Sequence, residues 1–160
     1  MKNQNLKIVA IGGGTGLSTI LKGLKKHTNN ITAIVAVTDS GGSSGILREE
    51  FNVLALGDMR RCILALSNAS SFMQEMFEHR FRSNGSFNGH SFGNIMMTAS
   101  TQVTQSDGLG IKKILEVLEV QGKVLPVTLE KCMLCAQLED GTIVKGEEYI
   151  DVPTHNPELR

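Results

Sequence analysis

Apolar residues near the N-terminus fall into runs whose spacing predicts a strand, a helix and a second strand. The run Leu6–Ile11 is broken only by Lys7, which is typical of a strand buried on both faces of a parallel sheet. The next apolar positions have the i, i+3, i+4, i+7 spacing of one helix face; they are Leu17, Ile20, Leu21 and Leu24. A second buried strand, Ile31–Val37, then ends just before Asp39. This part of the chain therefore predicts a βαβ unit, whose crossover should be right-handed.

Between about Gly57 and Gly122 the apolar residues recur with the spacing of helices instead. Four groups carry this pattern, at positions 59–66, 72–81, 92–99 and 111–118. We expect Asp58 to cap the start of the first of these helices and Gly122 to cap the end of the last. The segment 79–82 (HRFR), with three basic residues, is interpreted as a solvated patch at a helix end.

Strand character returns in the last third of the chain. A strand is expected at Val124–Leu129, followed by a hairpin in which Cys132–Leu138 and Thr142–Val144 flank the turn dipeptide Asp140-Gly141. The pattern as a whole predicts an α/β protein with a parallel sheet, an inserted helical segment and a C-terminal β-hairpin. We expect one domain over residues 1–150 and a frayed tail over residues 151–160.

The charge balance, the apolar runs and the cysteine content indicate which partners the protein can have and in which compartment it is found. Sixteen basic residues balance sixteen acidic ones, so the basic excess that nucleic-acid binding requires is missing. No apolar run approaches the roughly 20 residues of a membrane span, and the start MKNQNLKIVAI is too polar for a secretory signal. The 3 cysteines cannot form a disulfide framework. We therefore expect a cytoplasmic protein with neither nucleic acid nor membrane as its partner.

Glycine is the most informative residue type, because many of the 17 glycines are concentrated in the two segments GGGTG and GGSSG. The first segment joins the first predicted strand to the first predicted helix, where free amides and the helix dipole favour phosphate or pyrophosphate. Its residues are Gly12, Gly13, Gly14, Thr15 and Gly16. The segment matches neither the dinucleotide fingerprint nor the Walker pattern. The alternative is a tight packing turn without a ligand.

The second glycine segment follows the second predicted strand. Asp39 at that strand's end is expected to face a ribose hydroxyl, or else to begin an ordinary turn. The loop of Gly41, Gly42, Ser43 and Ser44 supplies amides and hydroxyls for an anion, although a mobile linker is the alternative. Arg48, just beyond, could pair with a phosphate.

Three further polar residues are candidates for chemistry. Asp58 either caps a helix or binds a metal or a substrate hydroxyl. His90 is a candidate acid or base near neutral pH, with a helix cap as the alternative, and Asn94 could hold a base edge or a sugar hydroxyl. The pair Cys132-x-x-Cys135 is interpreted as core packing rather than a metal site, because residues i and i+3 of a strand face opposite sides.

The motifs GGGTGLSTILKGLK, TDSGGSSGILREE, LGDMRR, GHSFGN and LEDGTIVKGE, in that order, closely resemble the gluconeogenesis factor (YvcK-like) family, a relative of the 2-phospho-L-lactate transferase CofD. The resemblance implies a Rossmann-like nucleotide-binding core with inserted helices. It also implies a cytoplasmic bacterial protein that binds a UDP-sugar such as UDP-N-acetylglucosamine and is needed for growth and cell shape on gluconeogenic carbon sources. CofD-type relatives instead transfer a phospholactyl group from a nucleotide-diphosphate donor with a divalent metal.

Three departures from the family pattern bear on this interpretation. Ser40 stands where a second Asp is usual, which removes one carboxylate from any metal site, and Arg61 replaces a usual Asn. Family members are also about twice as long, as a second unit of structure would make them. We therefore expect a non-catalytic binder of a nucleotide or nucleotide sugar. The alternative is a CofD-like transferase using Mg²⁺, with Asp58 and His90 as candidate catalytic residues and Asp58 as the candidate metal ligand; a homodimer is left open.

Overall fold

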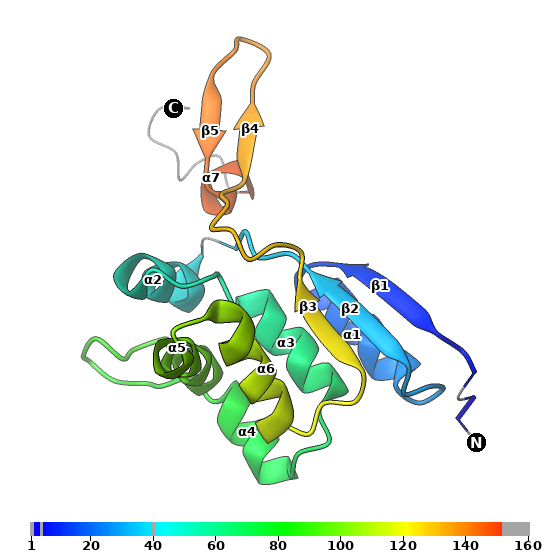
Figure 1. Ribbon diagram of the computed structural model, residues 1–160. Coiled ribbons are helices and arrows are strands. Elements are labelled where there is room, and N and C mark those ends of the chain that lie inside the picture. The colour runs from blue at the N-terminus through cyan, green and yellow to red at the C-terminus, as the bar shows by residue number, and fades with distance from the viewer. Residues whose placement is uncertain (1, 4, 40, 152–160) are drawn as a thin grey trace.

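The computed structural model describes residues 2–3, 5–39 and 41–151 (Figure 1). Its first half contains β1 (Ile8–Gly12), α1 (Gly14–Leu24), β2 (Ile31–Val35), α2 (Gly42–Phe51), α3 (Gly57–Leu66) and α4 (Ser71–Glu78). Its second half contains α5 (Phe92–Thr104), α6 (Asp107–Val117), β3 (Lys123–Pro126), β4 (Cys135–Gln137), β5 (Ile143–Lys145) and α7 (Glu147–Asp151).

The three strands β1, β2 and β3 form a parallel sheet with β2 in the centre. Ile8 pairs with Ile31 in β1 and β2, and Thr32 pairs with Lys123 in β2 and β3. Helices α2 to α6 all lie in the connection between β2 and β3, which makes them the inserted helical segment. The predicted α/β Rossmann-like fold is therefore confirmed, and so is the hairpin, because β4 and β5 pair antiparallel near the C-terminus (Figure 1).

Only one face of the sheet is covered by described helices. Ala33, Val35 and Val124 are buried on the face that α1 and α3 pack against. On the other face Val9 and Ile11 are 63% and 73% exposed. An ordinary parallel sheet has helices on both faces, so this chain builds half of such a layered arrangement.

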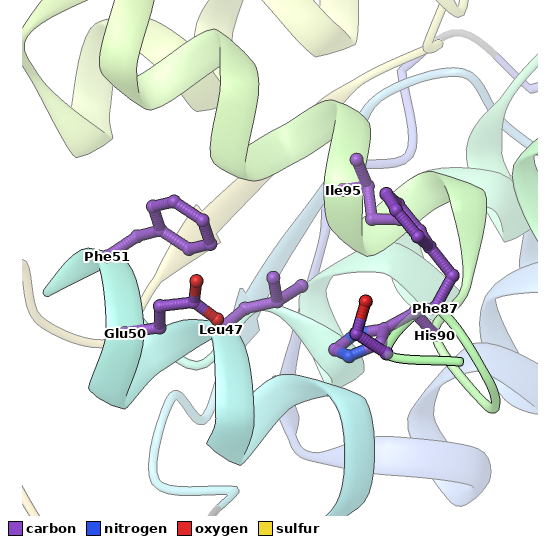
Figure 2. A pocket seen from close by; sticks show the side chains of 7 residues that line it. Leu47, Glu50, Phe51, Phe87, His90 and Ile95 are labelled. Carbon is purple, nitrogen blue, oxygen red and sulfur yellow. The ribbon is translucent and has the colours of Figure 1, made fainter.

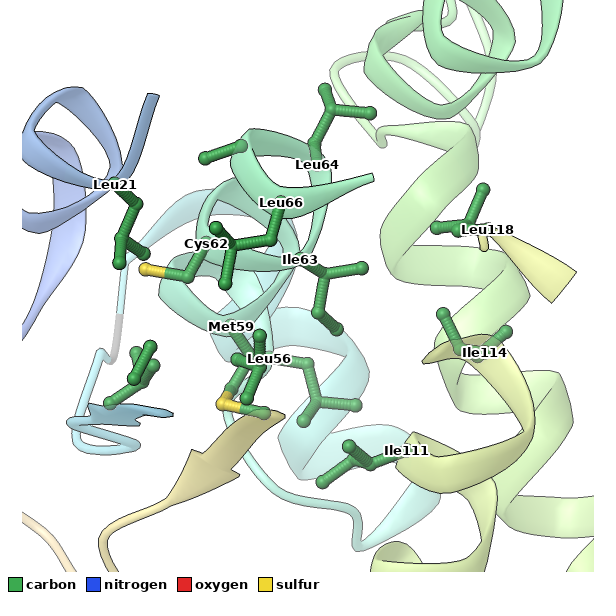
Figure 3. Packing of buried hydrophobic residues seen from close by; sticks show 14 of the residues in the cluster. Leu21, Leu56, Met59, Cys62, Ile63, Leu64, Leu66, Ile111, Ile114 and Leu118 are labelled. Carbon is green, nitrogen blue, oxygen red and sulfur yellow. The ribbon is translucent and has the colours of Figure 1, made fainter. Parts of the chain in front are cut away.

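Helix α3 lies at the centre of the core because it is apolar on nearly every side. Met59, Cys62, Ile63 and Leu66 are fully buried, and the residues around them come from α1, α5, α6 and the sheet (Figure 3). The packed core holds the start of α3 in place, and the start of α3 carries the polar residues described below.

The structure corrects several predicted boundaries. The GGSSG segment is the first turn of α2 rather than a mobile loop. Asp58 is the second residue of α3, whose N-cap is Leu56, so the predicted cap at Asp58 is wrong. Gly122 does not end α6, because α6 stops at Val117. Gly122 instead has φ +89 and precedes β3, and its backbone lies close to that of Ile31.

Smaller differences concern the strands and the cysteine pair. The predicted strands at Ile31–Val37 and Val124–Leu129 end earlier, at Val35 and Pro126. Cys135 is exposed in the hairpin, so core packing holds only for Cys132, which contacts the buried cluster. The predicted tail begins at Asp151, the last residue of α7, and its residues 152–160 lie outside the described part of the chain.

Candidate functional site

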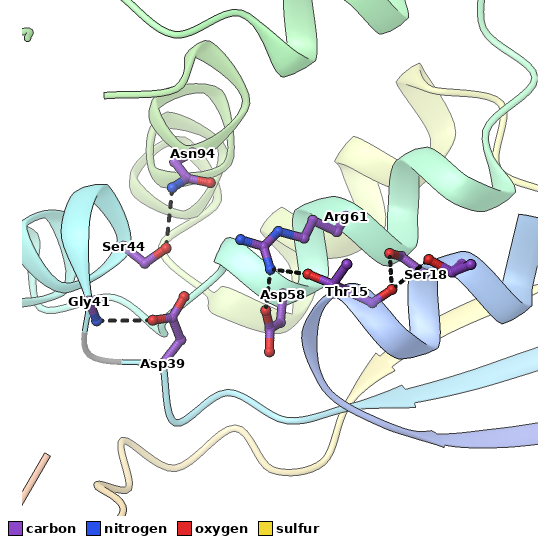
Figure 4. A network of polar contacts seen from close by, with 9 residues as sticks. Thr15, Ser18, Asp39, Gly41, Ser44, Asp58, Arg61 and Asn94 are labelled. Atoms are coloured by element: carbon purple, nitrogen blue, oxygen red, sulfur yellow. Dashed lines mark hydrogen bonds and ion pairs between the residues drawn. The ribbon is translucent and has the colours of Figure 1, made fainter. Parts of the chain in front are cut away.

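The N-termini of helices α1, α2 and α3 meet at the carboxyl end of the parallel sheet (Figure 4). The N-cap residues of these helices form no side-chain cap hydrogen bond; they are Gly13, Gly41 and Leu56. The N-caps of α4, α5 and α6, by contrast, are serines that accept a backbone N–H: Ser70, Ser91 and Ser106. Helix starts without side-chain caps leave amides and positive dipole ends available to other groups.

Two adjoining polar cavities lie at these helix starts. We call the first, of about 430 Å³, the acidic cavity; its lining is Gly13, Gly14, Ala36, Thr38, Asp39, Asp58, Arg61 and Glu147. We call the second, of about 240 Å³, the arginine cavity; its lining is Asp39, Gly41, Gly42, Ser43, Ser44, Gly57, Arg60, Arg61, Arg80 and Asn94. Asp39 and Arg61 line both cavities, so the two form one continuous polar region.

In the acidic cavity the carboxylate of Asp58 lies directly against the first glycine turn. It accepts the backbone N–H of Gly14, and its Oδ1 is 3.5 Å from Nη1 of Arg61. A β-carbon on Gly13 would come within 2.9 Å of Asp58 Oδ2, and Gly14 has φ +53. Asp58 therefore crowds any side chain at Gly13, and the left-handed backbone at Gly14 favours glycine.

The protonation of Asp58 reflects this crowded position. Burial, followed by the nearby charge of Asp39, raises the pKa of Asp58, and Arg61 and the Gly14 amide only partly oppose the rise. Arg61 is also tied to the turn itself, because its Nη1 donates to Thr15 Oγ1 at 3.2 Å (Figure 4). Two carboxylates close to each other thus face the acidic cavity.

A buried hydrogen-bond network fixes the wall of the arginine cavity. Nδ2 of Asn94 donates to Oγ of Ser43 and of Ser44, at 3.2 Å each. Oγ of Ser43 is in turn 3.0 Å from Nδ1 of His90. These contacts attach the first turn of α2 to the first turn of α5, which is why a glycine- and serine-rich segment can begin a helix here.

Two buried polar atoms of the arginine cavity have no partner among the described residues. They are Nε of Arg60 and Oδ1 of Asn94, on side chains whose residues are 6% and 4% exposed. Burial lowers the pKa of Arg60, and the charges of Arg80 and Arg61 lower it further. A buried cation beside like charges costs free energy unless an anion is bound near it.

Asp39 joins the two cavities. Its Oδ1 accepts the backbone N–H of Gly41 at 2.9 Å, so the turn expected as the alternative is present. The same residue lines both cavities, where its carboxylate could accept a ligand hydroxyl.

Other predicted site residues do not line either cavity. Arg48 Nη2 donates to the carbonyl of Cys132 at 2.7 Å. Gly12, Thr15 and Gly16 are absent from either lining. His90 does not cap α5, since Ser91 does. These assignments to a nucleotide or to catalysis therefore remain predictions.

His90 instead faces a third, mostly apolar pocket of about 290 Å³ (Figure 2). The pocket lies between α2, the segment before α5 and α5 itself, and its lining is Leu47, Glu50, Phe51, Ser86, Phe87, His90 and Ile95. Its lining contains no lysine or arginine, so it lacks the charges that a phosphate requires.

The sequence interpretation missed several residues that line the polar cavities, and four of them have chemically useful side chains that it did not discuss as site residues: Arg60, Arg80, Thr38 and Glu147. Arg60 could have been suspected, because a basic residue on the buried face of an apolar helix is unusual. Arg80 belonged to the patch expected to be solvated, and nothing in the sequence placed it beside Arg60. Thr38 and Glu147 line the acidic cavity and carry no sequence signal of their own.

A divalent cation would find oxygen donors in the acidic cavity. The described residues hold no group of three or more His, Cys, Asp or Glu side chains placed for a metal. Mg²⁺, however, is often bound by one or two carboxylates together with substrate phosphates. Asp39 and Asp58 fit that donor set, because both carboxylates line this cavity and the charge of Asp39 helps to raise the pKa of Asp58.

Comparison with known proteins identifies relatives over nearly the whole chain. The profile of the family described as 2-phospho-L-lactate transferase CofD matches residues 8–159. A protein from Thermoanaerobacterium thermosulfurigenes is 51% identical over 144 residues, which are 90% of this chain and 44% of that protein. A protein from Bacillus subtilis named gluconeogenesis factor is 44% identical over 147 residues, covering 92% of this chain and 46% of that one.

A solved structure agrees with these sequence matches. The crystal structure of a Bacillus halodurans protein superposes with a TM-score of 0.87 at 43% identity, over 94% of this chain and 47% of that one. The chain thus spans less than half of the length of these relatives. None of the helices among the described residues is long and apolar enough to cross a membrane.

Proposed function

Because the chain belongs to the CofD family, we propose that it binds a nucleotide-diphosphate sugar of the UDP-N-acetylglucosamine type. We further propose that it acts as a cytoplasmic regulatory protein for growth and cell shape on gluconeogenic carbon sources. The name gluconeogenesis factor on several relatives supports this role. The chain spans less than half of the length of these relatives, so the proposal concerns the part of the ligand site that this chain contains.

The observation that carries the proposal is the meeting of three helix starts at the carboxyl end of the sheet. Open α/β sheets bind ligands at this end. The amides there, together with Arg60, Arg61 and Arg80, suit a diphosphate, while Asp39 suits a sugar hydroxyl.

The same geometry favours binding over catalysis. His90 bonds to Ser43 and faces the apolar pocket, so the described acid–base groups at the polar cavities are carboxylates alone. A general acid or base has to reach the reacting group. A protein that senses a nucleotide sugar needs no such group.

A thermal-shift experiment tests the proposal. UDP-N-acetylglucosamine, UDP, GDP and NAD are added to this chain and to a full-length family member. A ligand at a hundredfold excess over Kd stabilises the folded state by about 2.7 kcal/mol, a Tm rise of roughly 5–11 °C for a chain of this size. Uridine without phosphate is the matched control. The proposal fails if no uridine nucleotide shifts either protein.

One observation favours a second candidate function, a CofD-like phospholactyl-type transferase. Asp39 and Asp58 face one cavity and fit Mg²⁺. A bound cation would neutralise developing charge on a phosphate, and these two carboxylates would hold and orient it. Magnesium-dependent turnover of a nucleotide-diphosphate donor, abolished in Asp58→Asn, would support this candidate. Nucleotide affinity that is indifferent to Mg²⁺ would count against it.

A further inference from the structure

We propose that the arginine cavity, rather than the first glycine turn, binds the diphosphate of the ligand. The inference rests on the proposed function for the identity of the ligand. It assigns the diphosphate to Arg60, Arg61 and Arg80, one sugar hydroxyl to Asn94 in the same cavity, and the other hydroxyl groups to the acidic cavity.

The first step is that the glycine turn is a poor anion site in this fold. The Gly14 amide already donates to Asp58, so a phosphate would have to displace a carboxylate. The acidic cavity, which contains this turn, is lined by three carboxylates, Asp39, Asp58 and Glu147, and one arginine, Arg61. The negative charges of these carboxylates repel those of a diphosphate, so a diphosphate in the acidic cavity would bind weakly.

The arginine cavity has the opposite balance. Three arginines line it against the single carboxylate of Asp39. It also contains the start of α2, a helix of 10 residues whose N-cap provides no side-chain hydrogen bond. Guanidinium groups and the positive end of a helix dipole both favour the negatively charged oxygens of a diphosphate.

The second, independent observation is the pair of unpartnered buried atoms. Nε of Arg60 is a donor and Oδ1 of Asn94 is an acceptor, each buried in a side chain that lines this cavity. Buried polar groups are almost always hydrogen-bonded in native proteins. A diphosphate accepts from Arg60, and a hydroxyl on the attached sugar donates to Asn94. The two atoms together therefore select a phosphate group that has a hydroxyl neighbour.

The test is calorimetric titration of this chain with inorganic pyrophosphate and, separately, with UDP-N-acetylglucosamine. Arg80→Gln removes a charge at the cavity wall; its side chain otherwise donates only to the carbonyl of Gly89 among the hydrogen bonds of the described residues. Arg82→Gln is the matched control, because Arg82 is exposed on the same segment and does not line the arginine cavity. Asn94→Asp is a second variant of equal size, in which the serine hydroxyls can donate instead of accept.

We expect Arg80→Gln to weaken pyrophosphate binding about tenfold, since a hydrogen bond to a charged group is worth at least that factor. We expect Asn94→Asp to weaken it as well, because the added negative charge repels the diphosphate. Arg82→Gln should change it less than twofold. Circular dichroism confirms that each variant is folded. The assignment is overturned if wild-type protein fails to bind pyrophosphate at millimolar concentration, or if all variants bind it equally.

The two ligands separate this inference from the proposed function. Loss of pyrophosphate affinity in Arg80→Gln, with no binding of UDP-N-acetylglucosamine by any protein, supports the cavity and rejects the nucleotide sugar. Equal binding of UDP-N-acetylglucosamine by wild type, Arg80→Gln and Asn94→Asp supports the function and rejects the cavity.

Discussion

Replacing Gly93 by alanine should destabilise the protein, because α5 approaches α4 and α3 too closely at this residue for a side chain. A β-carbon on Gly93 would lie 2.5 Å from the carbonyl oxygen of Phe77 and 2.7 Å from Cδ of Arg60. The carbonyl belongs to the backbone of α4 and cannot rotate away. The start of α5 would therefore have to move, together with Asn94, which follows Gly93 directly.

The size of the effect follows from these distances. A comfortable carbon–oxygen contact is about 3.3 Å or longer, so the methyl group is roughly 0.8 Å too close. Overpacking of this kind costs about 1–3 kcal/mol. Alanine regains up to about 1 kcal/mol of helix propensity, and less in the first turn of a helix. We therefore expect a net loss of about 1–2 kcal/mol, or about 2–8 °C in Tm for a chain of this length.

Urea unfolding followed by circular dichroism measures this loss, with Gly23→Ala as the matched control. A β-carbon on Gly23 would meet no atom within 4 Å, so that variant should gain up to about 1 kcal/mol. Gly93→Ala should also bind pyrophosphate more weakly than wild type, because Asn94 shifts with the helix start. If Gly93→Ala unfolds at the wild-type urea midpoint or above it, the close packing of α5 described above is wrong.

Three other outcomes are expected. The raised pKa of Asp58, caused by burial and by Asp39, means that the folded state keeps this proton to higher pH than the unfolded chain; stability from this group is therefore lost as pH rises through the folded pKa. The free energy of unfolding of Asp58→Asn minus that of wild type, measured in urea, should thus grow from pH 3.5 to 7. A difference independent of pH would contradict the raised pKa of Asp58. Burial raises the pKa of Cys62 to about 12, so a thiol reagent at pH 8 should label the exposed Cys135 and should label Cys62 only in urea. If the reagent labels Cys62 rapidly in the folded Cys135→Ser variant, the core around Cys62 is open. Phe77 is fully buried, and Phe77→Ala should cost about 3–5 kcal/mol in urea unfolding, whereas a loss below 1 kcal/mol would mean that the core repacks.

The sequence alone was sufficient to predict the elements that short patterns of neighbouring residues specify. An apolar run such as Ile31–Val37 is typical of a central strand in a parallel sheet, so this strand could be predicted without knowledge of its neighbours. The helical spacing of positions 59–66 likewise identified α3, and Asp140-Gly141 identified the hairpin turn. The family resemblance, carried by long ordered motifs, was confirmed by the comparisons.

Helix α2 shows why other elements depended on the tertiary structure. Glycine and serine have low helix propensity, so the segment GGSSG favours a loop when it is considered alone. In the folded protein Ser43 and Ser44 accept hydrogen bonds from Asn94, a residue about fifty positions away, and the helix begins there. No local pattern contains that contact.

The geometry of the candidate site also depends on contacts between residues that are distant in the sequence. The sequence by itself determined that glycine turns and acidic residues follow the parallel strands, and hence which end of the sheet is the candidate ligand-binding end. Only the fold placed Asp58 against Gly14 and Arg80 beside Arg60. Because electrostatic free energy depends on distance between charges and on burial, not on separation along the chain, the division into an acidic and an arginine cavity exists only in three dimensions.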